Sequence, residues 1–141
     1  MTVFLNGAAL LAIAAMFGGM AFFAAVYTPM IFRTLEKEDA AKLLRATFPV
    51  YYLAMGATGV AAALLALFAD RREEAGIVAI VALFFIFMRK FALPRIEYLR
   101  DAKVRGIAGA EKHFRSLHRT SMAVNLLQML GLGWVLVAMA G

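Results

Sequence analysis

Four polar side chains in the last apolar segment of the sequence could form a binding surface within a membrane. They are spaced i, i+3, i+7 and i+10, which places them on one face of a helix: His118, Ser121, Asn125 and Gln128. An unpaired amide in hydrocarbon is costly, so Asn125 and Gln128 must face protein or water. This face is either a source of hydrogen bonds between helices or the wall of a polar pocket.

Other polar groups are predicted to reach the same depth from neighbouring segments. The third apolar run ends at Arg89 on the side where the fourth begins, and Tyr27 and Tyr51 approach this level from the first two. A cavity lined by a cation, hydroxyls and amides would suit a small anionic solute, a polar headgroup or a proton relay. Alternatively, Arg89 and Lys90 extend into the headgroups and only anchor the chain.

Several kinds of chemistry find little support in the sequence. There is no cysteine, and all nine acidic residues lie between the apolar runs, which excludes thiol chemistry and a buried carboxylate pair. His113 and His118 are about 140° apart around a helix, so one helix cannot offer both to one metal ion. We therefore predict no catalytic or metal-ligating residue and no cofactor, and favour a protein that is not an enzyme. Haem bound through His118, or copper bound by methionines, is the alternative.

The elements that must position these residues are four membrane spans. The chain has 141 residues, of which 64% are hydrophobic and 17% charged, and no charged residue precedes Arg33. A span needs about 20 apolar residues. We predict an all-α integral membrane protein with one domain, residues 1–141, and with Pro49 near the start of the second helix. The four spans are predicted at about residues 3–31, 48–69, 75–96 and 120–140.

The basic residues predict how the spans are oriented. Thirteen of the 15 lysines and arginines lie in the first and third connections, which share one side of the membrane. By the positive-inside rule that side is cytoplasmic, so both termini lie outside, in what we expect to be a bacterial inner membrane. We expect two like-oriented hairpins with cytoplasmic helical extensions. The extension in the third connection is interrupted at Gly106 and Gly109. Pro29 and Pro94 occupy similar places in the two hairpins, as in a parallel repeat.

The expected partners follow from the same pattern. Basic residues that flank apolar runs favour the lipid bilayer and anionic lipid, or a small solute, over nucleic acid. The small-residue pairs Ala14/Gly18, Ala15/Gly19 and Gly59/Ala63 allow close helix contacts and a homo-oligomer or larger membrane complex.

Motifs in both halves resemble the transmembrane-protein-205-like family, small four-span membrane proteins of unknown function. In the first half they are Tyr27-Thr28-Pro29, Phe32-Arg33 and Phe48-Pro49-Val50-Tyr51. In the second half they are Leu99-Arg100-Asp101 and the stretch from Phe114 through His118 to Asn125. The resemblance implies a four-helix membrane fold. It also draws attention to a set of motif residues: Pro29, Arg33, Pro49, Arg100, Asp101, His118 and Asn125.

Three functions remain open from the sequence. The first is a transport, permeation or small-ligand-binding unit with its polar pocket near the cytoplasmic side. The second is an accessory or assembly subunit of a larger membrane complex, and the third is a membrane enzyme that holds haem, quinone or metal.

Overall fold

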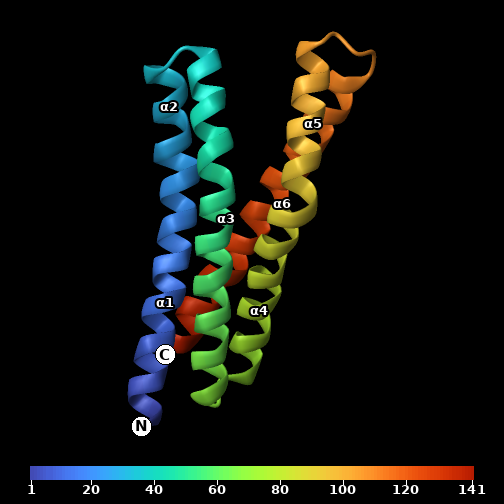
Figure 1. Ribbon diagram of the computed structural model, residues 1–141. Helices are drawn as coiled ribbons and strands as arrows, with labels where there is room; N and C mark the ends of the chain where they lie inside the picture. The colour runs from blue at the N-terminus through green and yellow to red at the C-terminus, as the bar shows by residue number, and fades with distance from the viewer.

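The computed structural model describes residues 1–141 and consists of helices joined by short turns (Figure 1). In chain order the elements are α1 (Thr2–Phe22), η1 (Phe23–Tyr27), α2 (Thr28–Thr34), α3 (Lys37–Phe68), α4 (Arg72–Phe87), η2 (Met88–Ala92), α5 (Leu93–Val104) and α6 (Ala110–Ala140). The π-helical turns η1 and η2 continue the helices around them, which leaves four long rods. All four are long and apolar enough to cross a membrane, and this confirms the predicted all-α, four-span architecture.

The rods are longer than a bilayer requires. Each has 31 to 33 residues, or about 50 Å of helix, against about 30 Å of hydrocarbon. The additional helical length includes the basic connections, so the predicted helical extensions are present. α5 ends at Val104 and α6 starts at Ala110, with the predicted break between them. Gly106 and Gly109 have φ values of 72° and 79°, a conformation that glycine adopts without strain.

The expectation that Pro49 lies near the start of the second helix is wrong. α3 begins at Lys37, and Glu38 and Asp39 in its first turn complement the positive end of the helix dipole. Pro49 lies inside the helix, where it cannot donate to the carbonyl of Arg45. The helix-forming residues on both sides of Pro49 thus keep α3 continuous through the proline.

Each of the other two prolines follows a π-helical turn. Pro29 is the second residue of α2 and Pro94 the second residue of α5, and 65 residues separate them. The amide of Thr28 donates to Phe23 and that of Leu93 to Met88, which are the five-residue steps of a π-helix. A proline ring clashes with the carbonyl four residues earlier in a regular α-helix, and a wider turn relieves this clash. The two hairpins thus share a local distortion at the same place.

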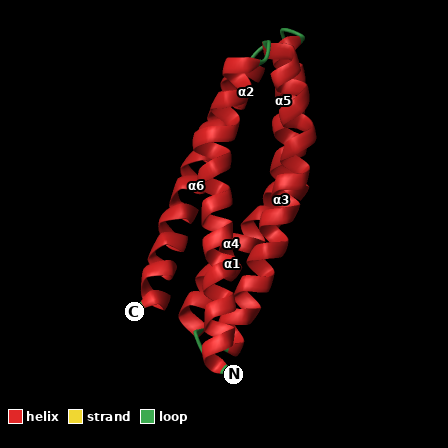
Figure 2. Cartoon of the chain, turned by 90° about the vertical axis from the view of Figure 1, so that its left-hand side faces the viewer, coloured by secondary structure: helices red, strands yellow, loops and turns green.

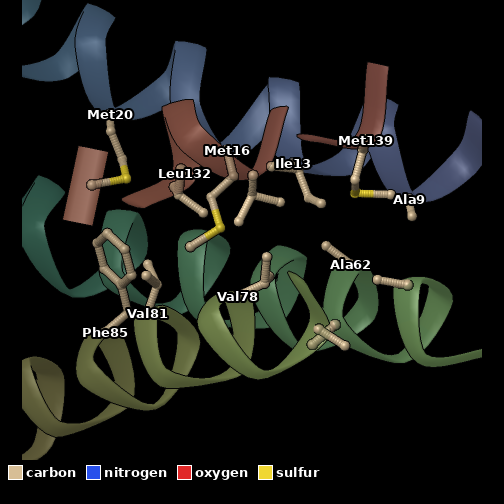
Figure 3. Close-up of a cluster of buried hydrophobic side chains, with 14 residues drawn as sticks. Ala9, Ile13, Met16, Met20, Ala62, Val78, Val81, Phe85, Leu132 and Met139 are labelled. Carbon is tan, nitrogen blue, oxygen red and sulfur yellow. The ribbon is translucent and has the colours of Figure 1, made fainter. Parts of the chain in front are cut away.

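The main core lies toward the end of the bundle that carries both termini (Figure 1), and Figure 3 shows its buried side chains between the helices. It contains 14 buried residues from α1, α3, α4 and α6, among them Ile13, Met16, Val78, Phe85 and Leu132. A close helix contact lies at Gly59, where a Cβ atom would lie 2.8 Å from the Cβ of Ala82. Only a glycine at this position lets α3 and α4 approach so closely.

The two hairpins separate toward the other end of the bundle. In Figure 1, the α2/α3 tip and the α5/α6 tip diverge above the region where α3 packs on α4. Figure 2 shows both of these tips at the end opposite the N- and C-termini. We call the end with the two tips the basic end, because it holds the basic first and third connections, and the opposite end the packed end.

Candidate ligand site at the basic end

Arg89 reaches across from the second hairpin to the first. It lies on η2, its side chain is exposed, and its Nε donates a hydrogen bond of 3.2 Å to the carbonyl of Pro49. The guanidinium therefore bonds to α3, and no hydrogen bond joins it to α6. Lys90, the next residue, is exposed and makes no hydrogen bond or ion pair within the chain.

A second arginine bridges the hairpins in the opposite direction. Nη2 of Arg45, on α3, lies 2.6 Å from Oδ1 of Asp101, on α5, and both side chains are about half exposed. These two arginine contacts are the only side-chain hydrogen bonds or ion pairs between the hairpins. Both of them lie toward the basic end.

Arg100 completes this charged group. It is partly buried on α5, and burial, followed by the positive charge of Arg45, lowers the pKa of its guanidinium. It has no ion-pair partner, and its charged group lies 5.9 Å from the centre of the Phe114 ring. Because the pKa of arginine is far above neutral, Arg45 and Arg100 both stay charged, and the carboxylates of Glu97 and Asp101 lie near enough to attract them.

The polar residues of α6 are satisfied mostly within their own hairpin. Gln128 is buried and its Nε2 donates to the carbonyl of Val81 on α4 at 3.5 Å. Ser121 donates to the carbonyl of Leu117 at 2.9 Å, and Asn125 contacts the sulfur of Met129 at 3.8 Å. Only the bond of Gln128 joins two helices, because the contacts of Ser121 and Asn125 stay within α6.

His118, the fourth member of that helix face, is exposed. Its ring stacks on the ring of Phe114, with 5.9 Å between the ring centres. The structure therefore separates His118 from the buried Gln128, although both lie on α6. His113 is exposed as well, and no cluster of three or more His, Cys, Asp or Glu side chains could hold a metal ion.

The two predicted site tyrosines belong to an aromatic group of the first hairpin. The hydroxyls of Tyr27 and Thr47 lie 3.1 Å apart. Tyr51 stacks on Phe23, with 4.1 Å between ring centres, and meets the edge of Phe85 at 5.9 Å. The π-helical turn η1 carries both Phe23 and Tyr27 and so sets their position against α3.

The remaining motif residues have separate surroundings. Pro29 shapes the η1–α2 junction, and Arg33 is exposed in the last turn of α2 without an ion-pair partner. Pro49 accepts the hydrogen bond from Arg89, and Asp101 pairs with Arg45. Of the predicted residues, Arg89 and Pro49 thus form one bridge between the hairpins, Asp101 belongs to a second bridge, and Arg100 is its neighbour on α5.

Sequence reasoning missed Arg45 as a member of this group. Arg45 and Asp101 are 56 residues apart, on different helices. Arg45 is one of several basic residues in the first connection, and nothing in the sequence pairs it with a particular carboxylate. Only the packing of α3 beside α5 brings the two together.

Comparison with known proteins corrects the family assignment. No curated protein and no solved structure matches the chain. A family model with the description "Domain of unknown function (DUF4149)" matches residues 11–140, and this replaces the expected membership of the transmembrane-protein-205-like family. The motifs behind that resemblance are short and rich in residues common at membrane interfaces, so they do not discriminate between small four-span families. Since the match covers almost the whole chain, the protein belongs to the family described as Domain of unknown function (DUF4149).

Proposed function

We propose that this protein is a small-ligand-binding and permeation unit that accepts an anion between its two hairpins. The observation that carries the proposal is that arginines donate both side-chain contacts between the hairpins, Arg45 to Asp101 and Arg89 to the Pro49 carbonyl. A free carboxylate or phosphate can compete for the same guanidinium groups.

The chemistry of the two contacts favours such an exchange. A guanidinium has five N–H donors and binds a carboxylate or phosphate through two parallel hydrogen bonds. Arg89 uses its Nε on a neutral carbonyl, which is a weaker acceptor than an anion. Both arginine side chains are exposed enough to meet a ligand from the water-facing side.

Binding at this place would be coupled to the arrangement of the hairpins. A ligand that displaces Asp101 and the Pro49 carbonyl removes the polar links at the basic end, while the core at the packed end stays closed. Rocking of one hairpin on the other around the Gly59–Ala82 contact would then alternate access to the ligand. We place the basic end in the cytoplasm of a bacterial cell and both termini outside, following the positive-inside rule.

Anion binding to the purified protein tests the proposal. We expect succinate or inorganic phosphate to raise its melting temperature, and Arg89→Gln to abolish the rise. Lys90→Gln is the matched control, because the neighbouring cation has no partner. In liposomes, the protein should carry the stabilising anion across the bilayer. The proposal fails if neither anion shifts the melting temperature, or if Lys90→Gln has the same effect as Arg89→Gln.

A second candidate is an accessory or assembly subunit of a larger membrane complex. Ala14 and Gly18 favour it, because both are exposed and a Cβ atom at Gly18 would meet nothing within 4 Å. This small-residue pair is therefore not used within the chain and is free for close contact with another helix. Purification in a mild detergent that yields a stable complex with other membrane proteins would favour this candidate, whereas a free monomer would argue against it.

A further inference from the structure

A basic patch lies on the outer face of α6 at the basic end. An open hollow of about 830 Å³ is lined entirely by residues 109–123, so the rest of the bundle supplies no wall. Its polar lining comprises Glu111, Lys112, Arg115, Ser116, Arg119 and Thr120. We call these six residues the α6 patch.

Two cations of the α6 patch have no partner in the chain. Lys112 and Arg119 are exposed and make neither a hydrogen bond nor an ion pair, and the hydroxyls of Ser116 and Thr120 likewise donate to no group of the protein. Arg115 is engaged, since its Nη2 lies 2.8 Å from Oε1 of Glu111. Glu111 also pairs with Lys103 at 3.5 Å, and the hydrogen bond from Arg115 is the main reason why its pKa is lowered.

The corresponding lysine of the first hairpin, unlike Lys112, has partners within its own helix. Lys42 occupies the corresponding place in α3, near the start of the helix and just before the second span. Its Nζ pairs with Glu38 at 3.1 Å and with Asp39 at 3.6 Å. The positive charge of Lys42 is thus neutralised locally, whereas that of Lys112 is available to a partner.

The α6 patch lies at the level of lipid headgroups. The stretch from Thr120 to Gly141 carries no charge and is about 33 Å long as a helix, which matches the hydrocarbon thickness. Arg119 therefore lies at the hydrocarbon boundary, and Lys112 about 10 Å beyond it, within reach of the headgroup region.

The same face of α6 becomes apolar directly below the patch. Leu126, Leu127 and Leu130 are 59%, 69% and 64% exposed, and they follow Ala123 along the helix toward the packed end. An acyl chain that descends from a headgroup bound at the patch would contact these leucines. Charge at one level and apolar side chains below it together describe the two parts of a phospholipid.

We propose that the α6 patch binds the phosphate of an anionic phospholipid through Lys112 and Arg119, with the Ser116 and Thr120 hydroxyls as further donors. The acyl chains then lie along the exposed leucines of α6. Lipid binding at this site does not depend on Arg45 and Arg89, because it needs no anion between the hairpins. The lipid proposal therefore stands even if the permeation proposal is wrong.

Spin-labelled lipids in reconstituted vesicles test this site. The preference of the protein for labelled phosphatidylglycerol over labelled phosphatidylcholine should fall about thirtyfold in the double variant Lys112→Gln/Arg119→Gln, because each of the two basic residues near an anionic surface contributes about 1 kcal/mol. The matched control is Lys37→Gln/Lys42→Gln, which removes the same charge from the start of α3. It should keep most of the preference.

Two further arms make the test decisive. Glu111→Gln should strengthen the preference for phosphatidylglycerol, because it releases Arg115 from its carboxylate partner. An excess of inorganic phosphate should leave the preference unchanged if a lipid is the ligand, and abolish it if the site binds free phosphate. The proposal is overturned if the control lowers the preference as much as the double variant does, if Glu111→Gln weakens it, or if phosphate abolishes it.

Discussion

The two ends of the bundle are held together by different forces. At the packed end, α3 and α4 approach through Gly59 and Ala82, and buried apolar side chains fill the space around them (Figure 3). At the basic end, the hairpins diverge and are linked by the side chains of Arg45 and Arg89. The packed end is therefore held by close packing of apolar side chains, and the basic end by exposed polar contacts.

This difference indicates which end can move. Lipid is as apolar as a leucine side chain, so close packing rather than hydrophobic burial holds helices together in a membrane. A contact through glycine has no long side chain that could rearrange. Exposed ion pairs contribute about 0.2–1 kcal/mol and exchange readily with solvent ions. The packed end should therefore stay closed while the basic end opens and closes.

The largest expected effect comes from breaking the packed end. Gly59→Leu places a side chain where even a Cβ atom lies 3.3 Å from the Cα of Ala82, so α3 and α4 must separate. Overpacking of this kind costs about 1–3 kcal/mol or more, which thermal unfolding in detergent would detect. Gly18→Leu is the control, because its Cβ meets open space, and it should leave stability nearly unchanged. Equal loss in both variants would contradict the assignment of Gly59 to the tight contact.

A smaller effect is expected where the packed end gives way to the polar residues of α6. Gln128→Leu removes the long hydrogen bond to the Val81 carbonyl and should cost about 0.6 kcal/mol in thermal unfolding, the average for such bonds in a membrane. The matched Asn125→Leu should cost less, because Asn125 contacts only a sulfur on its own helix. A loss of several kcal/mol in Gln128→Leu would point to a functional water or ligand beside it.

The smallest change in stability is expected at the basic end, where the distance between the two tips should change instead. Asp101→Asn removes the ionic partner of Arg45, and a double-mutant cycle with Arg45→Gln should give a coupling of about 0.5 kcal/mol that weakens with salt. The chain has no cysteine, so spin labels at Lys37→Cys and Arg105→Cys report the distance between the tips without interference. Asp101→Asn should broaden this distance distribution. An unchanged distribution would show that the ion pair does not limit motion of the tips.

Much of the fold could be predicted because each feature had a local cause. The uncharged runs mark the spans, and Gly106 and Gly109 mark the turn before α6. The start of the second helix was predicted wrongly because proline is common at the start of a helix. In the structure the charged residues from Lys37 onward are also helical, so α3 begins more than two turns before Pro49. The π-helical turns before Pro29 and Pro94 were not foreseen, although the prolines that cause them were noted.

The candidate site was predictable only in part. Arg89 was singled out from its type and position and Asp101 from a family resemblance, but the sequence suggested that Arg89 would face His118 and Asn125 on α6. The structure turns Arg89 toward Pro49 on α3 and leaves His118 exposed on Phe114. A helical face is known from spacing alone, whereas the neighbour that it meets depends on how the helices cross.

The sequence by itself determined four membrane helices and the concentration of thirteen basic residues at one end, because charge is excluded from hydrocarbon and helices alone satisfy the backbone there. Tertiary structure decided the rest. It placed Arg45 beside Asp101, pressed Gly59 against Ala82, and left Lys112 and Arg119 without partners. These contacts join residues far apart in the chain, and their geometry follows from helix crossing and side-chain shape, which no local pattern in the sequence encodes.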